Sequence, residues 1–263
     1  ARAIRDVHGL TGADAAYRLM NGAGDLVPGV IVDVYGAFAV ASALSSALVP
    51  VATTIADTLL GRGDARGVVV KHRGRGKVTG PVPMDVRGEA PPERLIVREG
   101  ALAFEVHLAA GINVGLFTDM RDERPVVTRL GRGRRVLNLF AYTGAFSVAA
   151  LAGGASHVTS VDLSEGVLAW ARDHVALNGL DASRHTTVAA DVAQFLAAAA
   201  DRGDQFDVVL IDPPSYSAAR GAGFAIDRDY PAIIATACRV LAPGGDLWLA
   251  SNTRGFSLTG AVQ

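Results

Sequence analysis

Apolar residues in the second half of the chain fall in short continuous runs that alternate with segments of helical periodicity. The predicted strands are 135–140, 157–161, 185–189, 206–211 and 246–250, and the predicted helices are 145–152, 165–178, 192–200 and 230–241. Strands that are apolar throughout, each followed by a helix, indicate a parallel sheet that helices cover on both faces. We therefore expect an α/β fold with a doubly wound, Rossmann-like sheet over residues 111–263.

The first half of the chain follows a different pattern. Short apolar runs at 17–20, 30–35 and 38–43 are separated by turn residues, which predicts a strand meander. Helical spacing follows at 48–60, and further strands are predicted at 67–71, 95–98 and 103–108. The order strand, strand, helix, strand, strand predicts a small α+β domain over residues 1–110, which we interpret as a substrate-recognition module.

Composition narrows the class of protein. Half of the 263 residues are hydrophobic and 19% are charged, which is typical of a globular chain with a substantial core. No apolar run approaches the ~20 residues of a membrane-spanning helix, and we expect no membrane partner. Cys238 is the only cysteine, and the histidines follow no metal-binding spacing. We therefore expect a cytoplasmic protein without a bound metal.

The net charge of −1 gives no general indication of nucleic-acid binding. Four basic residues are nevertheless clustered within seven positions: Lys71, Arg73, Arg75 and Lys77. They can form the solvated tip of a hairpin, which the sequence favours, or a loop that contacts phosphates of a nucleic acid.

Polar residues follow the predicted strands of the second half, where parallel sheets bind their ligands. These positions are 138–144, Asp162, Asp191, the run Asp212-Pro213-Pro214, and 251–254. Asp162 comes 18 residues after Gly144, the placement of an acid that binds ribose hydroxyls, although Asp162 and Asp191 could instead only cap helices. The loop at 138–144 matches neither G-x-G-x-x-G nor a P-loop. The pattern therefore favours a nucleoside without phosphates, such as S-adenosylmethionine.

Four segments together resemble a known family. Residues 138–144, 161–164, 207–216 and the block Gly115-Leu-Phe-Thr-Asp-Met-Arg121 are similar to motifs of bacterial large-subunit (23S) ribosomal RNA methyltransferases with the class I fold. The resemblance extends over about residues 17–256. The small N-terminal domain resembles the module found in the cytosine-5 branch of that family.

The resemblance, taken with the strand-end pattern, implies roles for particular residues. The expected cofactor contacts are Asp119, Arg121, Asn138, Phe140, Tyr142, Thr143, Gly144, Asp162, Leu163, Ser164, Asp191, Val192 and Asp212. The expected catalytic residues, which face the methyl acceptor, are Asp212, Pro213, Pro214 and Asn252. The expected substrate contacts are Lys71, Arg73, Arg75, Lys77, Tyr216 and Arg254.

Two features depart from the cytosine-5 branch. No segment of the sequence resembles the PUA domain with which that branch usually begins, and residues 250–256 contain no cysteine after the fifth strand. Methylation at a pyrimidine C5 needs a covalent adduct, and Cys238 lies within a predicted helix, away from the strand ends. The run Ser251-Asn-Thr-Arg-Gly-Phe256 instead resembles the guanine-N7 half of a bifunctional 23S rRNA enzyme.

We therefore predict direct methyl transfer from S-adenosylmethionine to a base of 23S rRNA, with guanine N7 as the leading acceptor. Three alternatives remain: a cytosine-5 rRNA methyltransferase, a small-molecule methyltransferase, and an RNA-binding assembly factor without catalysis. The oligomeric state stays open, with a homodimer among the options. This fold usually closes with two further strands, so we expect the sequence to lack its last strands, and its true start to lie upstream because it has no initiator methionine.

Overall fold

The structure is a computed structural model that describes residues 2–7, 9–73, 83–214, 216–217 and 224–251. The chain divides into two compact units, Ala1–Asp122 and Glu123–Gln263. The boundary lies beyond the expected position near residue 110, because residues 111–121 are bonded to the sheet of the first unit. Each unit is described separately below.

The first unit is a five-stranded sheet with one long helix and a hairpin. Its helices are α1 (Arg2–Val7) and α2 (Val49–Gly61), and its strands are β1 (Ala16–Asn21), β2 (Val30–Tyr35), β3 (Phe38–Ala43), β4 (Gly67–His72), β5 (Met84–Gly88), β6 (Leu95–Glu99) and β7 (Leu102–Val106). The sheet order is β1-β2-β3-β4-β5, and β6 pairs with β7. The predicted meander, helix and hairpin are confirmed, whereas α1 and β5 were not predicted.

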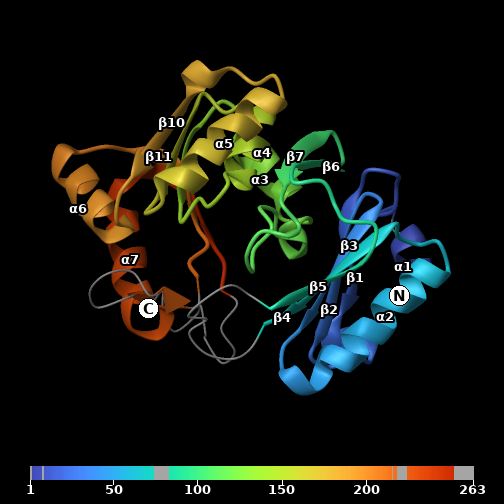
Figure 1. Ribbon diagram of the computed structural model, residues 1–263. Coiled ribbons are helices and arrows are strands. Elements are labelled where there is room, and N and C mark those ends of the chain that lie inside the picture. Colours follow the sequence, from blue (N-terminus) through green and yellow to red (C-terminus); the bar gives the residue numbers. More distant parts are fainter. Residues whose placement is uncertain (1, 8, 74–82, 215, 218–223, 252–263) are drawn as a thin grey trace. The chain divides into compact units, whose positions relative to one another are not determined.

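Helix α2 packs on one face of this sheet, as Figure 1 shows, and buries an apolar cluster that includes Val32, Ala41, Ala56 and Val70. The apolar stripe of α2 and the inward side chains of β2, β3 and β4 supply this core, as their spacing predicted. Strands β3 and β4 run parallel, which is possible because α2 connects them.

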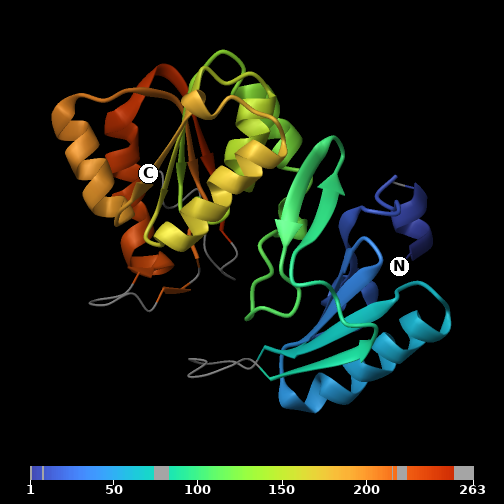
Figure 2. The same ribbon diagram turned by 45° about the horizontal axis from the view of Figure 1, so that its top comes forward.

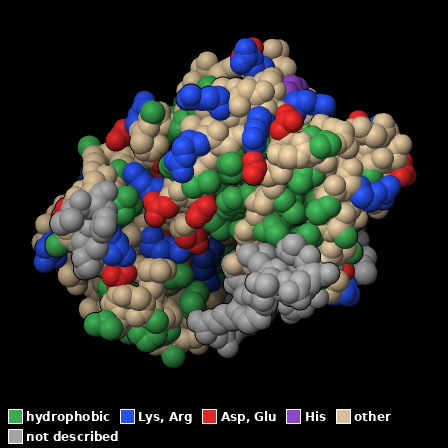
Figure 3. Space-filling model, turned by 180° about the vertical axis from the view of Figure 1, so that it is seen from behind, with side chains coloured by type: hydrophobic (Ala, Val, Ile, Leu, Met, Phe, Trp, Pro, Cys, Tyr) green, Lys and Arg blue, Asp and Glu red, His purple; other side chains and the backbone are tan. Residues whose placement is uncertain are grey.

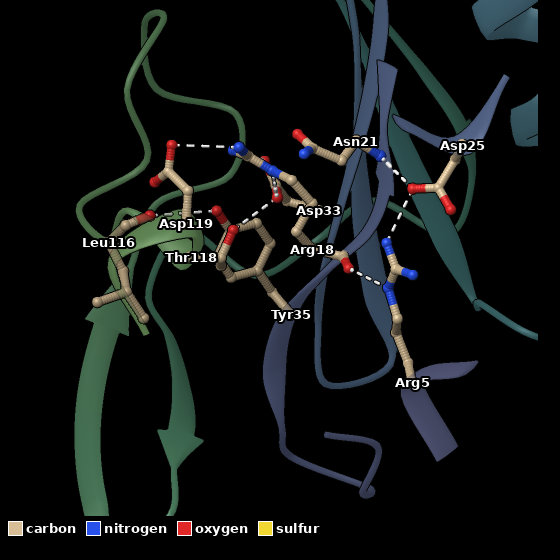
Figure 4. A network of polar contacts seen from close by, with 9 residues as sticks. All are labelled: Arg5, Arg18, Asn21, Asp25, Asp33, Tyr35, Leu116, Thr118 and Asp119. Carbon is tan, nitrogen blue, oxygen red and sulfur yellow. Dashed lines mark hydrogen bonds and ion pairs between the residues drawn. The ribbon is translucent and has the colours of Figure 1, made fainter. Parts of the chain in front are cut away.

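The segment 111–121 is bonded to side chains from the opposite face of the same sheet. The Tyr35 hydroxyl donates to the Leu116 carbonyl at 3.2 Å, and the Thr118 hydroxyl donates to Asp33 at 2.6 Å. Arg18 makes ion pairs with Asp33 at 2.9 Å and with Asp119 at 3.1 Å (Figure 4). These bonds attach the segment to β1 and β2 and explain why it belongs to the first unit.

The second unit alternates strands and helices. Its helices are α3 (Arg124–Leu130), α4 (Ala145–Ala152), α5 (Glu165–Leu177), α6 (Val192–Arg202) and α7 (Ile226–Val240), and its strands are β8 (Arg135–Leu139), β9 (His157–Asp162), β10 (His185–Ala189), β11 (Phe206–Ile211), β12 (Tyr216–Ser217), β13 (Phe224–Ala225) and β14 (Leu241–Leu249). The predicted strand–helix alternation is confirmed. Helix α3 and the short β12–β13 pair were not predicted, and α7 and β14 begin earlier than expected.

The main sheet of this unit has the order β10-β9-β8-β11-β14, and all its pairings are parallel. Helices α3, α4 and α5 lie on one face and α6 and α7 on the other (Figures 1 and 2). From β8 the chain adds β9 and β10 on one side of the sheet, and then β11 and β14 on the other side of β8. The position between β8 and β11 is therefore the switch point, where such sheets bind ligands. Among the residues that the structure describes, no helix has the length and apolar character needed to cross a membrane.

Candidate functional site

The loop after β8 has an unusual backbone. Phe140, Tyr142 and Gly144 have φ values of 57°, 49° and 73°, in the left-handed region that residues with a side chain rarely adopt. A β-carbon on Gly144 would lie 2.6 Å from the Cβ of Ala171 in α5, so only glycine fits there. Strained backbone of this kind persists where surrounding structure enforces it, and it is concentrated at functional sites.

Asp162, at the end of β9, is bonded to two backbone amides. Its Oδ2 accepts from the amide of Tyr142 at 3.0 Å, and its Oδ1 accepts from the amide of Ser164 at 3.0 Å. The residue is only partly buried. A carboxylate has about four acceptor positions, so two remain for the adjacent hydroxyls of a ribose. Asp162 thus organises the loop and retains the capacity that the sequence analysis assigned to it.

The residues that follow β9 and β10 form the neighbouring part of the strand-end edge. Leu163 is 53% exposed, an unusual exposure for leucine that suits the apolar face of a nucleoside base. The side chains of Ser164 and Asp191 cap α5 and α6, accepting from the amides of Val167 and Gln194. The capping alternative is therefore confirmed for Asp191, whereas the cap of α5 is Ser164 and not Asp162. Asp191 keeps a second oxygen for a ligand.

Two expected cofactor residues lie in the core. Val192 is 3% exposed and packs with the apolar cluster of the sheet. Asn138 is 2% exposed, and its amide donates to the hydroxyl of Ser147 in α4 at 2.8 Å. Both side chains make their contacts inside the second unit, and they therefore support the site structurally.

Asn138 begins a buried polar chain across the sheet. The Ser147 hydroxyl is 2.7 Å from that of Ser160, which is 2.8 Å from Nε2 of His185. Burial lowers the pKa of His185 to about 4, and the nearby charges of His157 and Arg172 act in the same direction. His185 is therefore neutral at physiological pH, and the chain holds α4, β8, β9 and β10 together without a charge.

The expected acceptor motif directly follows β11. Asp212 is partly buried, Pro213 is buried and Pro214 is exposed. Beneath them lies Tyr230, which is fully buried and whose hydroxyl is within hydrogen-bond distance of two carbonyls, Ala250 at 2.8 Å and Ile211 at 3.1 Å. Burial raises the pKa of Tyr230, the Asp212 carboxylate adds to the rise, and the bond to Ala250 opposes it. Sequence reasoning missed Tyr230, because nothing distinguishes it from an ordinary core aromatic at the start of a helix.

The candidates in the first unit have partners within that unit. Arg121 donates to the Ala16 carbonyl, and Asp119 pairs with Arg18. Lys71 is fully buried and donates to the Gly111 carbonyl at 2.8 Å. Burial, together with the nearby charge of Arg73, lowers the pKa of Lys71 to about 8. The buried ammonium group cannot reach an RNA phosphate, so the expectation for Lys71 was wrong.

Arg73 is partly buried and donates to the side chain of Asn113 at 2.9 Å. The remaining predicted substrate and acceptor residues Arg75, Lys77, Asn252 and Arg254 lie outside the described residues. Tyr216 is described only as part of the backbone pair β12–β13.

The second unit therefore has the features of an enzyme that binds a nucleoside cofactor. The parallel sheet has its switch point beside the strained loop, and an acid with spare acceptor positions follows the neighbouring strand. With the exposed Leu163, this arrangement fits an adenosine group. The loop after β8 is not a phosphate-binding loop. No cluster of three or more metal-binding side chains occurs in the described parts of the chain. The fold and site define the class of Rossmann-like proteins that bind a nucleoside cofactor.

Comparison with known proteins identifies the family within this class. The family model for S-adenosylmethionine-dependent methyltransferases matches residues 41–257. The chain belongs to this family, and S-adenosylmethionine is its cofactor. A crystal structure of a protein described as a methyltransferase, in complex with SAH, superposes with a TM-score of 0.87 at 29% identity, covering 99% of this chain and 67% of the other.

Curated relatives carry more specific names. The Salmonella arizonae protein named ribosomal RNA large subunit methyltransferase I is 37% identical over 241 residues, covering 88% of this chain and 58% of the relative. The Chromohalobacter salexigens protein named ribosomal RNA large subunit methyltransferase K/L is 43% identical over 176 residues, covering 66% of this chain and 24% of the relative. The chain thus spans little more than half the length of the first relative.

Proposed function

We propose that this protein is a methyltransferase that transfers a methyl group from S-adenosylmethionine to a base of 23S ribosomal RNA. The observation that carries the proposal is the 37% identity with ribosomal RNA large subunit methyltransferase I over 88% of this chain. This similarity includes both the N-terminal unit and the sheet with its strand-end site.

We propose that the cofactor lies over the ends of β8, β9 and β10. Asp162 accepts from the ribose hydroxyls, Leu163 contacts the base, and the loop at 140–144 lies along the nucleoside. The sulfonium of the bound cofactor supplies an activated methyl group, so the protein mainly orients the reactants and excludes water.

The acceptor base lies beside Asp212-Pro213-Pro214, and guanine N7 is the acceptor that we favour. A ring nitrogen has a lone pair and needs no covalent activation. Cys238 is exposed in α7, and residues 250–256 contain no cysteine. A thiol adduct at the strand end, which cytosine-5 methylation requires, is therefore not supported by this part of the chain.

The distribution of surface charge agrees with recognition of RNA through a few local contacts. On the coloured part of the face in Figure 3, Lys and Arg are interspersed with Asp and Glu. Arg73, Arg75 and Lys77 remain the proposed RNA contacts near the β4–β5 connection. Charge reversal at Arg73 and Arg75 should weaken RNA binding and leave SAH binding unchanged.

The test uses the full chain, tritium-labelled S-adenosylmethionine and unmodified 23S rRNA, followed by mass spectrometry of the nucleosides. A parallel reaction contains a metabolite extract in place of RNA. The proposal predicts label in RNA and 7-methylguanosine among the products. Label in 5-methylcytidine would overturn the guanine assignment, and transfer only to metabolites would overturn the RNA substrate.

A further inference from the structure

His174 occupies a position next to the cofactor loop that the proposed reaction does not use directly. It is fully buried in α5, and its Nδ1 lies 2.9 Å from the carbonyl oxygen of Thr143. A carbonyl can only accept, so Nδ1 carries the proton and donates. Thr143 is itself fully buried, and water therefore cannot replace this bond.

Two residues on one face of α5 meet the same loop. Ala171 precedes His174 by one helical turn, and its Cβ approaches Gly144 so closely that no side chain fits there. His174 holds the carbonyl of the preceding residue. Helix α5 thus fixes both the position and the peptide orientation of the segment Thr143–Gly144.

The loop needs this support because its backbone is strained. Phe140, Tyr142 and Gly144 all have positive φ. Asp162 holds the Tyr142 amide on one side, and His174 holds the Thr143 carbonyl on the other. If either bond is lost, the loop can relax toward ordinary backbone conformations, in which its atoms no longer follow the ligand.

We infer that His174 is a positioning residue that holds the cofactor-binding loop in its binding conformation through the bond from Nδ1 to the Thr143 carbonyl. The inference rests on the proposed cofactor site. The imidazole touches no substrate in this account and acts only through the loop. Its contribution is to the affinity for S-adenosylmethionine, because a preorganised loop loses less conformational freedom on binding.

Paired substitutions separate this role from simple core packing. His174→Asn keeps a nitrogen donor at the same distance from the backbone, whereas His174→Leu fills the space without a donor. Val175→Ala, at a neighbouring buried position of α5, lowers stability and leaves the His174 imidazole in place. Calorimetry with SAH should show roughly tenfold weaker binding for His174→Leu, as expected for one buried hydrogen bond. Binding by His174→Asn and Val175→Ala should stay within about twofold of the unmodified protein.

The outcomes are distinguishable. Unchanged affinity in His174→Leu, equal weakening in Val175→Ala, or no recovery in folded His174→Asn would each overturn the inference. Failure of the unmodified protein to bind SAH would instead overturn the proposed cofactor site. Nitrogen NMR of the unmodified protein gives an independent test that does not depend on whether His174→Leu folds. The inference requires the His174 ring to carry its proton at Nδ1. A ring protonated only at Nε2 would refute the bond.

Discussion

The carboxylate of Asp162 and the backbone amide of Tyr142 are 3.0 Å apart, although twenty residues separate them in the sequence. This bond connects the end of β9 to the strained loop after β8. The residue that we assign to the ribose therefore also shapes the loop beside it, and a single substitution tests both effects.

Removal of the Tyr230 hydroxyl should impair methyl transfer more than cofactor binding. In Tyr230→Phe the Ala250 carbonyl loses its donor, and the ends of β11 and β14 beside Asp212 are held less firmly. We expect stability to fall by about 1 kcal/mol and kcat by roughly tenfold, with SAH affinity unchanged. Urea unfolding, calorimetry and transfer assays measure these quantities.

Ile234→Val is the matched control for that substitution. Ile234 is buried in the same helix, and the change should cost about 1 kcal/mol without affecting the strand ends. A kcat as low as that of Tyr230→Phe in this control would show that general destabilisation, and not the lost bond, impairs transfer.

Cys238→Ser should leave methyl transfer intact. Cys238 is exposed and lies eight residues after Tyr230 in α7, which corresponds to about 12 Å along a helix from the strand ends. Transfer to RNA and binding of SAH are measured for both proteins. An inactive variant that still folds and binds SAH would restore a cysteine mechanism and the cytosine-5 interpretation.

His185 should make the second unit less stable in acid. Its pKa is about 4 in the folded chain against 6.5 ordinarily, so between these values the unfolded chain binds more protons. The contribution is fully present above pH 6.5 and is lost as pH falls through that window, by about 2 kcal/mol after allowance for solvent screening. Urea unfolding from pH 7.5 to 4.5 measures it. His185→Asn should show a flatter profile, and an equally steep one would exclude His185 as the cause.

The buried Lys71 should have an effect of the same sign on the first unit, at alkaline pH. Its pKa is about 8 against 10.5 ordinarily, so stability rises as pH increases from 8 to 10.5, where only the unfolded chain remains protonated. Lys71→Met should be about 1 kcal/mol more stable than the unmodified protein at pH 7, because it removes a buried charge. This advantage should shrink at pH 10. A difference that does not change with pH would show that the ammonium group is solvated.

Periodicity predicted most of the second unit, because buried parallel strands and amphipathic helices have unambiguous patterns. It failed for the short segments α1, α3 and β5, whose stability comes from tertiary packing more than from local preference. The expected boundary at residue 110 was wrong for the same reason, since the bonds of Thr118 and Asp119 to distant strands have no local signal.

Strand-end residues such as Asp162 could be predicted, because a parallel sheet brings the carboxyl ends of its strands to one edge. The residues that support them could not. His174 and Tyr230 act through bonds to backbone carbonyls, and their partners depend on how helices pack on the sheet. Lys71 was misassigned because a basic run in the sequence does not reveal that its first member points into the unit.

The central claim is that S-adenosylmethionine binds at the ends of β8, β9 and β10 through Asp162. The most direct test is calorimetric titration of the unmodified protein, Asp162→Ala and the exposed-acid control Asp173→Ala with SAH, after confirming that all three are folded. We predict one site per chain, normal affinity in Asp173→Ala, and affinity at least roughly 30-fold weaker in Asp162→Ala, because hydrogen bonds to a charged acceptor are lost. Equal affinity in Asp162→Ala and the unmodified protein would contradict the claim.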